Sequence, residues 1–147
     1  MASKRKPAKP DLLIHGIKPY KPRKNEAYMG APQLKHFEAI LNAWRAELSS
    51  DTSKTVVHMQ DETANHPDPT DRASQETDMA LELRGRDRDR KLIKKIDESI
   101  AHLSSGDFGY CENCGEEIGL KRLEARPTAT LCIDCKTLDE IREKQLS

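Results

Sequence analysis

Apolar residues recur every three or four positions in two stretches of the chain, and this spacing predicts two long helices. Leu34, Phe37, Leu41, Trp44 and Leu48 follow one another at steps of 3, 4, 3 and 4. The positions between them are polar, as expected for the a/d seam of a coiled coil. In the second stretch the residues expected to face inward are Met79, Leu83, Ile93, Ile96, Ile100 and Leu103.

Proline and glycine mark the ends of both predicted helices. Gly30-Ala31-Pro32 opens the first, because proline is tolerated in the first turn of a helix. His66-Pro67-Asp68-Pro69 forces a turn, since each proline also restricts the residue before it. Ser104-Ser105-Gly106 closes the second helix, because glycine is favoured just past a helix end.

Antiparallel pairing of the two helices would place Leu34 opposite Leu103, and the other facing pairs would keep the same sum of 137. The midpoint then falls between Asp68 and Pro69, inside the predicted turn. Hydrophobic phase and proline positions therefore agree on a hairpin with its tip near residues 61–71. Each arm has about 30 residues, which corresponds to about 45 Å at 1.5 Å per residue.

The chain contains four cysteines, and they form two CxxC pairs separated by seventeen residues. This pattern is typical of a structural zinc site, in which four thiolates fill the tetrahedral coordination sphere and leave no place for water or substrate. The predicted ligands of one structural zinc ion are Cys111, Cys114, Cys132 and Cys135. Gly115 suits a tight reversal after the first pair.

A last helix is expected from Cys135 to Leu146, with Cys132 and Cys135 at its start and Leu138 and Ile141 on one face. Free amides and the helix dipole at that position favour thiolate.

Two alternatives to zinc are a pair of disulfides and thioredoxin-like redox chemistry. Disulfides belong to oxidising compartments, whereas the chain shows no signal peptide and has 34% charged residues. We therefore expect a cytoplasmic protein with reduced thiols. Thioredoxin-like chemistry normally uses one CxxC in a βαβ context, which this sequence does not suggest.

Composition agrees with a mainly α protein built on a narrow apolar seam. Hydrophobic residues make up 35% of the chain and aromatic residues 4%, too few for a large core, and no run is long enough to span a membrane. Residues 1–30 contain eight basic and two acidic residues, a net charge of +6. We predict three parts: a basic, proline-rich and partly disordered segment (1–30), a coiled-coil hairpin (31–106), and a zinc finger with its C-terminal helix (107–147). A monomer is expected.

Two acidic residues lie at the predicted tip. Asp68 and Asp71 flank Pro69 and Thr70, which is favourable chemistry for starting a helix. The same carboxylates are also suited to reach a partner or its bound metal, since hard cations prefer oxygen ligands. A convex tip offers no pocket to exclude water, so we predict that the protein is not an enzyme.

Basic residues surround the cysteine pairs: Lys121, Arg122, Arg126 and Lys136. They either neutralise the net −2 charge of zinc with four thiolates or, together with Lys95, bind a phosphate-rich ligand. No helix with base-reading side chains stands out, so sequence-specific DNA binding is not expected.

Four segments in order resemble the DksA/TraR family of bacterial RNA polymerase-binding transcription factors. They are residues 68–73 (DPTDRA), 83–96 (LRGRDRDRKLIKKI), 108–115 (FGYCENCG) and 122–129 (RLEARPTA). The resemblance extends over roughly residues 30–147. Gly85 stands where asparagine is expected in the best-known members.

The resemblance implies a hairpin that enters the secondary channel of RNA polymerase, with its tip near the active-site magnesium. It implies that activity depends on Asp68, Asp71 and Ala73. It further implies that the alarmone ppGpp acts together with the protein, at a site shared with the polymerase rim, to regulate initiation and repress ribosomal RNA promoters. The corresponding ppGpp-binding positions are Leu92, Lys95, Arg126 and Lys136, with Arg122 as a further candidate.

Two other functions fit the same sequence features. A Gre-type transcript-cleavage factor would use similar carboxylates at a similar tip. A zinc-finger module that binds nucleic acid directly would use the basic segment 1–30 as its anchor.

Overall fold

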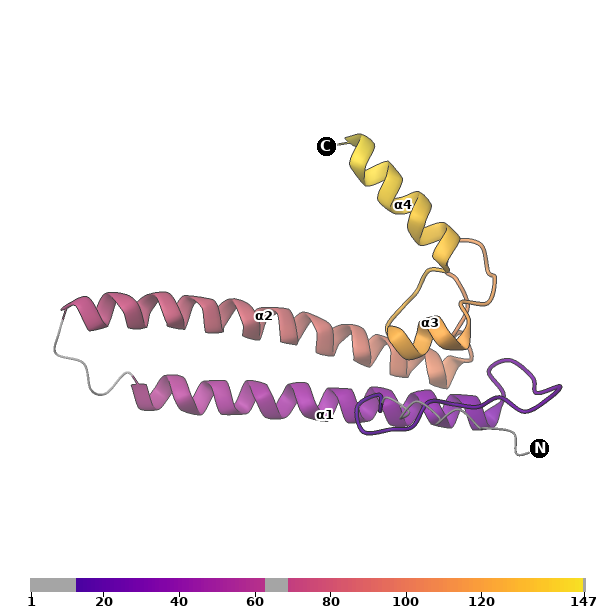
Figure 1. Ribbon diagram of the computed structural model, residues 1–147, viewed down its shortest axis with the longest axis horizontal. Coiled ribbons are helices and arrows are strands. Elements are labelled where there is room, and N and C mark those ends of the chain that lie inside the picture. Colours follow the sequence, from indigo (N-terminus) through magenta and orange to yellow (C-terminus); the bar gives the residue numbers. More distant parts are fainter. Residues whose placement is uncertain (1–12, 63–68, 147) are drawn as a thin grey trace, which may run out of the picture. The chain divides into compact units, whose positions relative to one another are not determined.

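Four helices account for most of the structure, a computed structural model that describes residues 13–62 and 69–146, without the side chains of residues 55–62. In chain order they are α1 (Ala31–Glu62), α2 (Pro69–Ser105), α3 (Leu120–Ala125) and α4 (Ile133–Leu146), drawn in Figure 1. The chain divides into two compact units. The base unit combines Met1–Ile40 with Phe108–Ser147, and the arm unit is Leu41–Asp107. The predicted mainly α fold is confirmed.

The arm unit is a helical hairpin. From Leu41 onward α1 runs antiparallel beside α2 (Figure 1). The second helix begins at Pro69 and ends at Ser105, as proline and glycine predicted. Gly106 adopts a φ of 84°, and its N–H donates to the carbonyl oxygen of His102 at 3.0 Å. Only glycine takes up this left-handed conformation without strain, which is why the helix ends there.

Two residues that the predicted register pairs are buried in the arm. Leu41 and Ile96, whose numbers sum to 137, both have fully buried side chains. The Nε atom of Arg45 lies 2.7 Å from Oδ1 of Asp97, a pair whose numbers sum to 142. In the predicted register, Arg45 would face Leu92. Its side chain instead contacts Asp97, five residues further along α2. Both side chains are about half exposed, so solvent screens this ion pair and its contribution to stability is small.

The inward face of α2 differs from the prediction at one position. Leu83 is 46% exposed, so its assignment to the seam was wrong. Extending the alternation of three and four residues backward from Leu103 leads to Glu82 instead, which is half-buried. Arg86 and Asp89 continue this row and are half-buried as well. The heptad phase is set by the aliphatic residues between Ile93 and Leu103, and it overrides the hydrophobicity of Leu83.

The base unit has a small apolar core to which α1 contributes its first turns. Phe37 and Leu123 are fully buried, and Phe108 and Ile118 are nearly so. The ring centroids of Phe37 and Phe108 lie 5.4 Å apart in a tilted arrangement. At the start of α1, Gln33 is buried and its Oε1 accepts a hydrogen bond from the N–H of Met29 at 2.8 Å. This contact ties the segment before α1 to the helix.

The segment that precedes α1 packs on the same core. The backbone N–H of Tyr20 donates to Oε1 of Glu124 on α3 at 3.0 Å. The ring of Tyr20 lies against that of His36, with centroids 5.2 Å apart. Ile14 and Ile17 pair through two backbone hydrogen bonds of 2.8 and 2.9 Å. The described part of this proline-rich segment is therefore folded onto the base unit.

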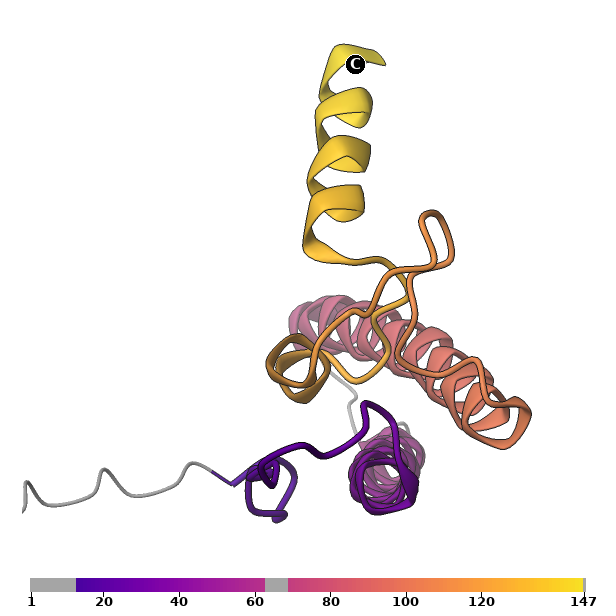
Figure 2. The same ribbon diagram turned by 90° about the vertical axis from the view of Figure 1, so that its right-hand side faces the viewer.

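The last helix, α4, begins two residues earlier than predicted, at Ile133. None of its described residues is buried, and Leu138 and Ile141 are 55% and 47% exposed. Figures 1 and 2 both show α4 extending away from α3. In the described part of the chain, no helix is long and apolar enough to cross a membrane.

The burial of His36 predicts a pH-dependent stability. Burial lowers the pKa of this histidine, and the nearby Glu124 carboxylate, 3.6 Å from Nε2, only partly opposes the effect. The unfolded chain therefore takes up a proton near the ordinary pKa of about 6.5, before the folded chain does, and stability falls as the pH drops through that value.

We expect His36→Gln to flatten the loss of stability between about pH 7 and about pH 5.5, measured by urea unfolding with circular dichroism. His102→Gln, in the arm unit, is the matched control. An unchanged pH slope in His36→Gln would contradict the assignment.

Candidate functional site

The four cysteines come together in the base unit. Their sulfur atoms all lie within 4.8 Å of one another, and all four cysteines are free. The Sγ atoms of Cys114 and Cys132 are 3.7 Å apart, far beyond the ~2.05 Å of a disulfide bond. Two sulfur ligands of a tetrahedral zinc, each about 2.3 Å from the metal, lie about 3.8 Å apart. The cluster therefore fits zinc and contradicts the disulfide alternative.

The electrostatics of the cluster also favour a bound cation. Backbone N–H groups of Cys114 and Cys132 lower the pKa of the Cys111 thiol to about 6, which favours thiolate. In contrast, the crowded sulfurs of Cys132, Cys111 and Cys114 raise the pKa of the Cys135 thiol strongly. Four thiolates this close repel one another, and a divalent cation at their centre removes that repulsion.

The first pair of cysteines lies in a short hairpin. Tyr110 and Glu117 form an antiparallel bridge, and the N–H of Cys111 donates to the carbonyl oxygen of Glu116 at 2.8 Å. The chain reverses at Gly115, whose φ of 75° confirms the predicted tight turn. We call residues 109–119 the knuckle hairpin.

The second pair of cysteines lies at the start of α4, as predicted. The backbone N–H of Cys135 approaches Sγ of Cys132 at 3.5 Å, and the N–H of Lys136 donates to its carbonyl oxygen at 2.9 Å. The N–H of Glu112 donates to the carbonyl oxygen of Thr130 at 2.9 Å and so joins the two pairs. All four positions are occupied by thiols, so the site holds the fold and leaves no open coordination position for substrate.

The predicted tip is described in part. Asp71 and Ala73 lie in the first turns of α2, and both are exposed. Asp68 lies outside the described residues. Asp71 is the acidic residue of the first turn of α2, where a carboxylate stabilises the exposed N–H groups of the helix start.

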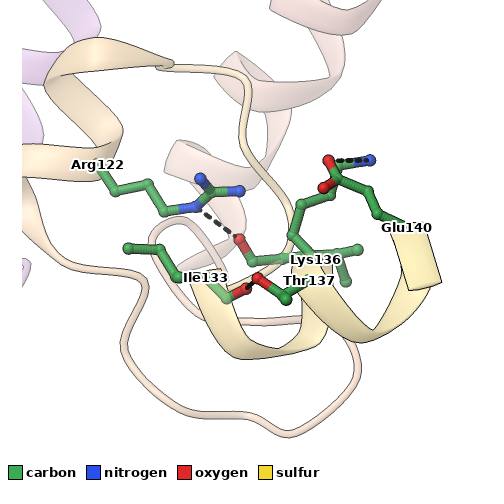
Figure 3. Close-up of polar contacts among 6 residues, drawn as sticks. Arg122, Ile133, Lys136, Thr137 and Glu140 are labelled. Carbon is green, nitrogen blue, oxygen red and sulfur yellow. Dashed lines mark hydrogen bonds and ion pairs between the residues drawn. The ribbon is translucent and has the colours of Figure 1, made fainter.

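The basic candidates for ppGpp binding fall in both units. Leu92 and Lys95 lie on α2 in the arm unit, whereas Arg122, Arg126 and Lys136 lie in the base unit. Figure 3 shows that the Arg122 side chain points toward the start of α4, where its Nε donates to the carbonyl oxygen of Leu131 at 3.0 Å. Arg122 therefore supports the loop before the second cysteine pair.

The other two basic candidates of the base unit are Lys136, which is half-buried, and Arg126, which is exposed. Lys136 lies on α4, and its Nζ is 3.9 Å from Oε1 of Glu140 (Figure 3). Arg126 is exposed and ends α3, where its backbone N–H donates to the carbonyl oxygen of Arg122 at 2.8 Å. Arg126, whose side chain is exposed, is therefore better placed than Arg122 to bind an external anion.

A groove on the arm unit was not predicted. It has a volume of about 520 Å³ and is lined by Leu81, Arg84, Asp87, Arg88 and Lys91. These residues recur at three- and four-residue steps, so they share one face of α2. The sequence shows that residues 84–91 are nearly all charged. Which of these residues lie together on the exposed face depends on which side of α2 packs against α1.

A helical hairpin in one unit and a four-cysteine zinc site in the other define the class of protein: a zinc-finger protein with a coiled-coil arm. Family models agree with both parts. The model of the DnaK suppressor protein DksA N-terminal domain matches residues 33–103, and that of the prokaryotic dksA/traR C4-type zinc finger matches residues 106–140.

Known relatives cover nearly the whole chain. The RNA polymerase-binding transcription factor DksA of Salmonella typhimurium is 60% identical over 136 residues, covering 92% of this chain and 90% of the relative. The protein of that name from Haemophilus influenzae is 61% identical, covering 92% and 94%. The structure of transcription factor DksA2 from Pseudomonas aeruginosa has a TM-score of 0.76 and 40% identity over 80% of this chain and 91% of that one. The chain belongs to the DksA family.

Zinc binding leads to a direct prediction. We expect one zinc ion per chain by atomic absorption, and we expect Cys132→Ser to lose most of it and to unfold the base unit at lower temperature, since metal binding supplies folding free energy. Glu112→Gln, an exposed change inside the first pair, is the matched control. Full zinc content in Cys132→Ser would contradict a four-thiolate site.

Proposed function

We propose that this protein binds RNA polymerase and regulates transcription initiation without catalysing a reaction itself. The observation that carries the proposal is the identity of about 60% across 92% of the chain to proteins named as RNA polymerase-binding transcription factors. The four cysteines and the hairpin that such a relationship requires are both present in the described structure. Such a regulator works in the cytoplasm, where the polymerase is.

The arm unit would act as an insert into the secondary channel of the polymerase. A two-helix rod is slender enough to enter a passage that excludes a globular domain. Asp71 and Ala73 are exposed on the first turns of α2 and, with Asp68, would act near the catalytic magnesium. Carboxylates placed there would perturb the metal site or the mobile elements around it. Initiation would then change without any reading of DNA sequence.

In this proposal, each of the three parts predicted from the sequence has its own role in binding the polymerase. The hairpin, residues 31–106, would reach the active centre, and the zinc finger with its helix, residues 107–147, would hold the protein on the polymerase surface. The basic residues 1–30, with a net charge of +6, would add contacts to an acidic face.

The alarmone ppGpp would bind at the shared surface with the polymerase. Lys95 and Arg126 are both exposed cations, and Lys136 adds a third positive charge in the base unit. Charged hydrogen bonds of this kind are the strong contacts to phosphate. Leu92, which is half-buried, would supply an apolar contact beside Lys95. Arg122 would contribute through its support of the loop, since its Nε already donates to Leu131.

The tip is tested by the double change Asp68→Asn and Asp71→Asn. We expect the variant to bind purified bacterial RNA polymerase as the wild type does and to lose at least about tenfold of its effect on a ribosomal RNA promoter in transcription assays, because two carboxylates become neutral amides. Asp78→Asn, an exposed aspartate further along α2, is the matched control.

Unchanged transcription by the tip variant would refute the role of the tip. If the wild-type protein added to stalled elongation complexes released cleaved RNA 3′ ends, the Gre-type alternative would replace the proposal. Salt-dependent binding to DNA without polymerase would favour the nucleic-acid-binding alternative.

The alarmone site is tested by Lys95→Ala with Arg126→Ala. We expect this variant to lose the added effect of ppGpp while keeping the effect of the protein alone, because only the contacts to phosphate are removed. Lys94→Ala, the exposed neighbour of Lys95, is the control. Full synergy with ppGpp in the double variant would show that these cations do not bind it.

A further inference from the structure

A single hydroxyl group closes the knuckle hairpin. The Oη atom of Tyr28 donates to the carbonyl oxygen of Gly109 at 2.7 Å and accepts from the N–H of Gly119 at 2.9 Å. Tyrosine has one donor and can also accept, so this hydroxyl uses both functions on the two ends of one loop. The residues it joins are 81 and 91 positions away in the sequence.

These two glycines bracket the first pair of zinc ligands. Between them, the N–H of Ile118 donates to the carbonyl oxygen of Gly109 at 2.9 Å, and Tyr110 bridges to Glu117. The carbonyl oxygen of Gly109 thus accepts two hydrogen bonds, one from within the hairpin and one from Tyr28. The hairpin is closed at its open end by the hydroxyl and carries Cys111 and Cys114 toward its turn.

Side-chain packing holds the tyrosine in this position. The ring of Tyr28 meets that of Tyr110 edge to face, with centroids 5.6 Å apart and an interplanar angle of 84°. The neighbouring Met29 lies directly over Gly109, since a Cβ atom added to that glycine would come within 2.9 Å of the methionine Cγ. Burial raises the pKa of the Tyr28 hydroxyl, which keeps it protonated as a donor.

Tyr28 also belongs to the segment that packs on the base unit ahead of α1. That segment is anchored at a second point, where the N–H of Tyr20 donates to Glu124 on α3. The hydroxyl of Tyr20 instead bonds to Glu26, inside the same segment. The two tyrosines therefore offer a matched comparison, because only the Tyr28 hydroxyl reaches the knuckle hairpin.

We propose that Tyr28 is a positioning residue for the zinc centre, whose hydroxyl couples the docking of the segment before α1 to the closure of the first cysteine pair. Coupling between two equilibria is reciprocal. Loss of the Tyr28 hydrogen bonds therefore makes zinc dissociate faster, and removal of zinc weakens the packing of the segment before α1. The inference does not depend on polymerase binding or on ppGpp.

The first test measures zinc release from the purified full-length protein. Transfer of zinc to excess 4-(2-pyridylazo)resorcinol is followed by absorbance for wild type, Tyr28→Phe and Tyr20→Phe. We expect Tyr28→Phe to release zinc roughly threefold to tenfold faster, as expected when a hydroxyl holding two backbone groups is lost, and Tyr20→Phe to behave as wild type. An unchanged rate in Tyr28→Phe, or an equal increase in both variants, would overturn the proposal.

The second test reads the coupling in the other direction, first in the wild-type protein and then in Tyr28→Phe. Hydrogen exchange of backbone amides is compared in zinc-loaded and zinc-free wild-type protein. We expect the amides of Ile14, Ile17 and Glu26, which donate within the segment, to exchange faster without zinc. In zinc-loaded Tyr28→Phe, the amide of Gly119 is expected to exchange faster than in wild type. Equal protection of the segment with and without zinc would refute the coupling.

Discussion

The structure of the base unit depends on four thiols held within 4.8 Å of one another. Uncompensated, that cluster is unfavourable, because the surrounding sulfurs raise the pKa of the Cys135 thiol while backbone amides favour thiolate at Cys111. A bound zinc ion would stabilise the four thiolates together and add folding free energy to a unit whose apolar core is small. The knuckle hairpin, the start of α4 and the loop supported by Arg122 all converge on it.

The arm unit is stabilised by different physics. Heptad packing is strong at Leu41 and Ile96, where side chains are fully buried, and it weakens where Glu82, Arg86 and Asp89 occupy the seam of α2. A seam of half-buried polar residues contributes less apolar burial than an aliphatic one. Stability in the arm is therefore graded, with less of it on the side toward the start of α2. That gradient would suit the proposed insertion into a partner, since the helices could adjust at that end without unfolding the rest of the arm.

Several residues named for function also have a structural duty. Asp71 stabilises the first turn of α2, and Arg122 supports the loop before the second cysteine pair. Arg126 and Lys95 are exposed. A change at Arg122 would therefore affect folding as well as the proposed ligand binding, whereas changes at Lys95 or Arg126 would separate the two. This distinction comes from hydrogen bonds across the base unit and is not visible in the composition of the basic cluster.

The sequence by itself determined the features that depend on local chemistry. Proline and glycine marked the start of α1 and both ends of α2, the cysteine spacing predicted the zinc ligands, and the alternation of apolar residues predicted the burial of Leu41 and Ile96. Proline, glycine and each CxxC pair act within a few residues, and the apolar alternation repeats along a single helix. The short helix α3 has no comparable periodic signal, and sequence reasoning passed over it.

Only the tertiary structure decided which face of α2 turns inward near residue 83 and what Tyr28 does. Hydrophobicity favoured Leu83, but packing against α1 imposes one phase on the whole helix and places Glu82 inward instead. The Tyr28 hydroxyl meets partners 81 and 91 residues away, and a tyrosine that packs alone looks the same in sequence as one that closes a distant loop. Contacts over such separations depend on how whole elements pack, which no short stretch of sequence encodes.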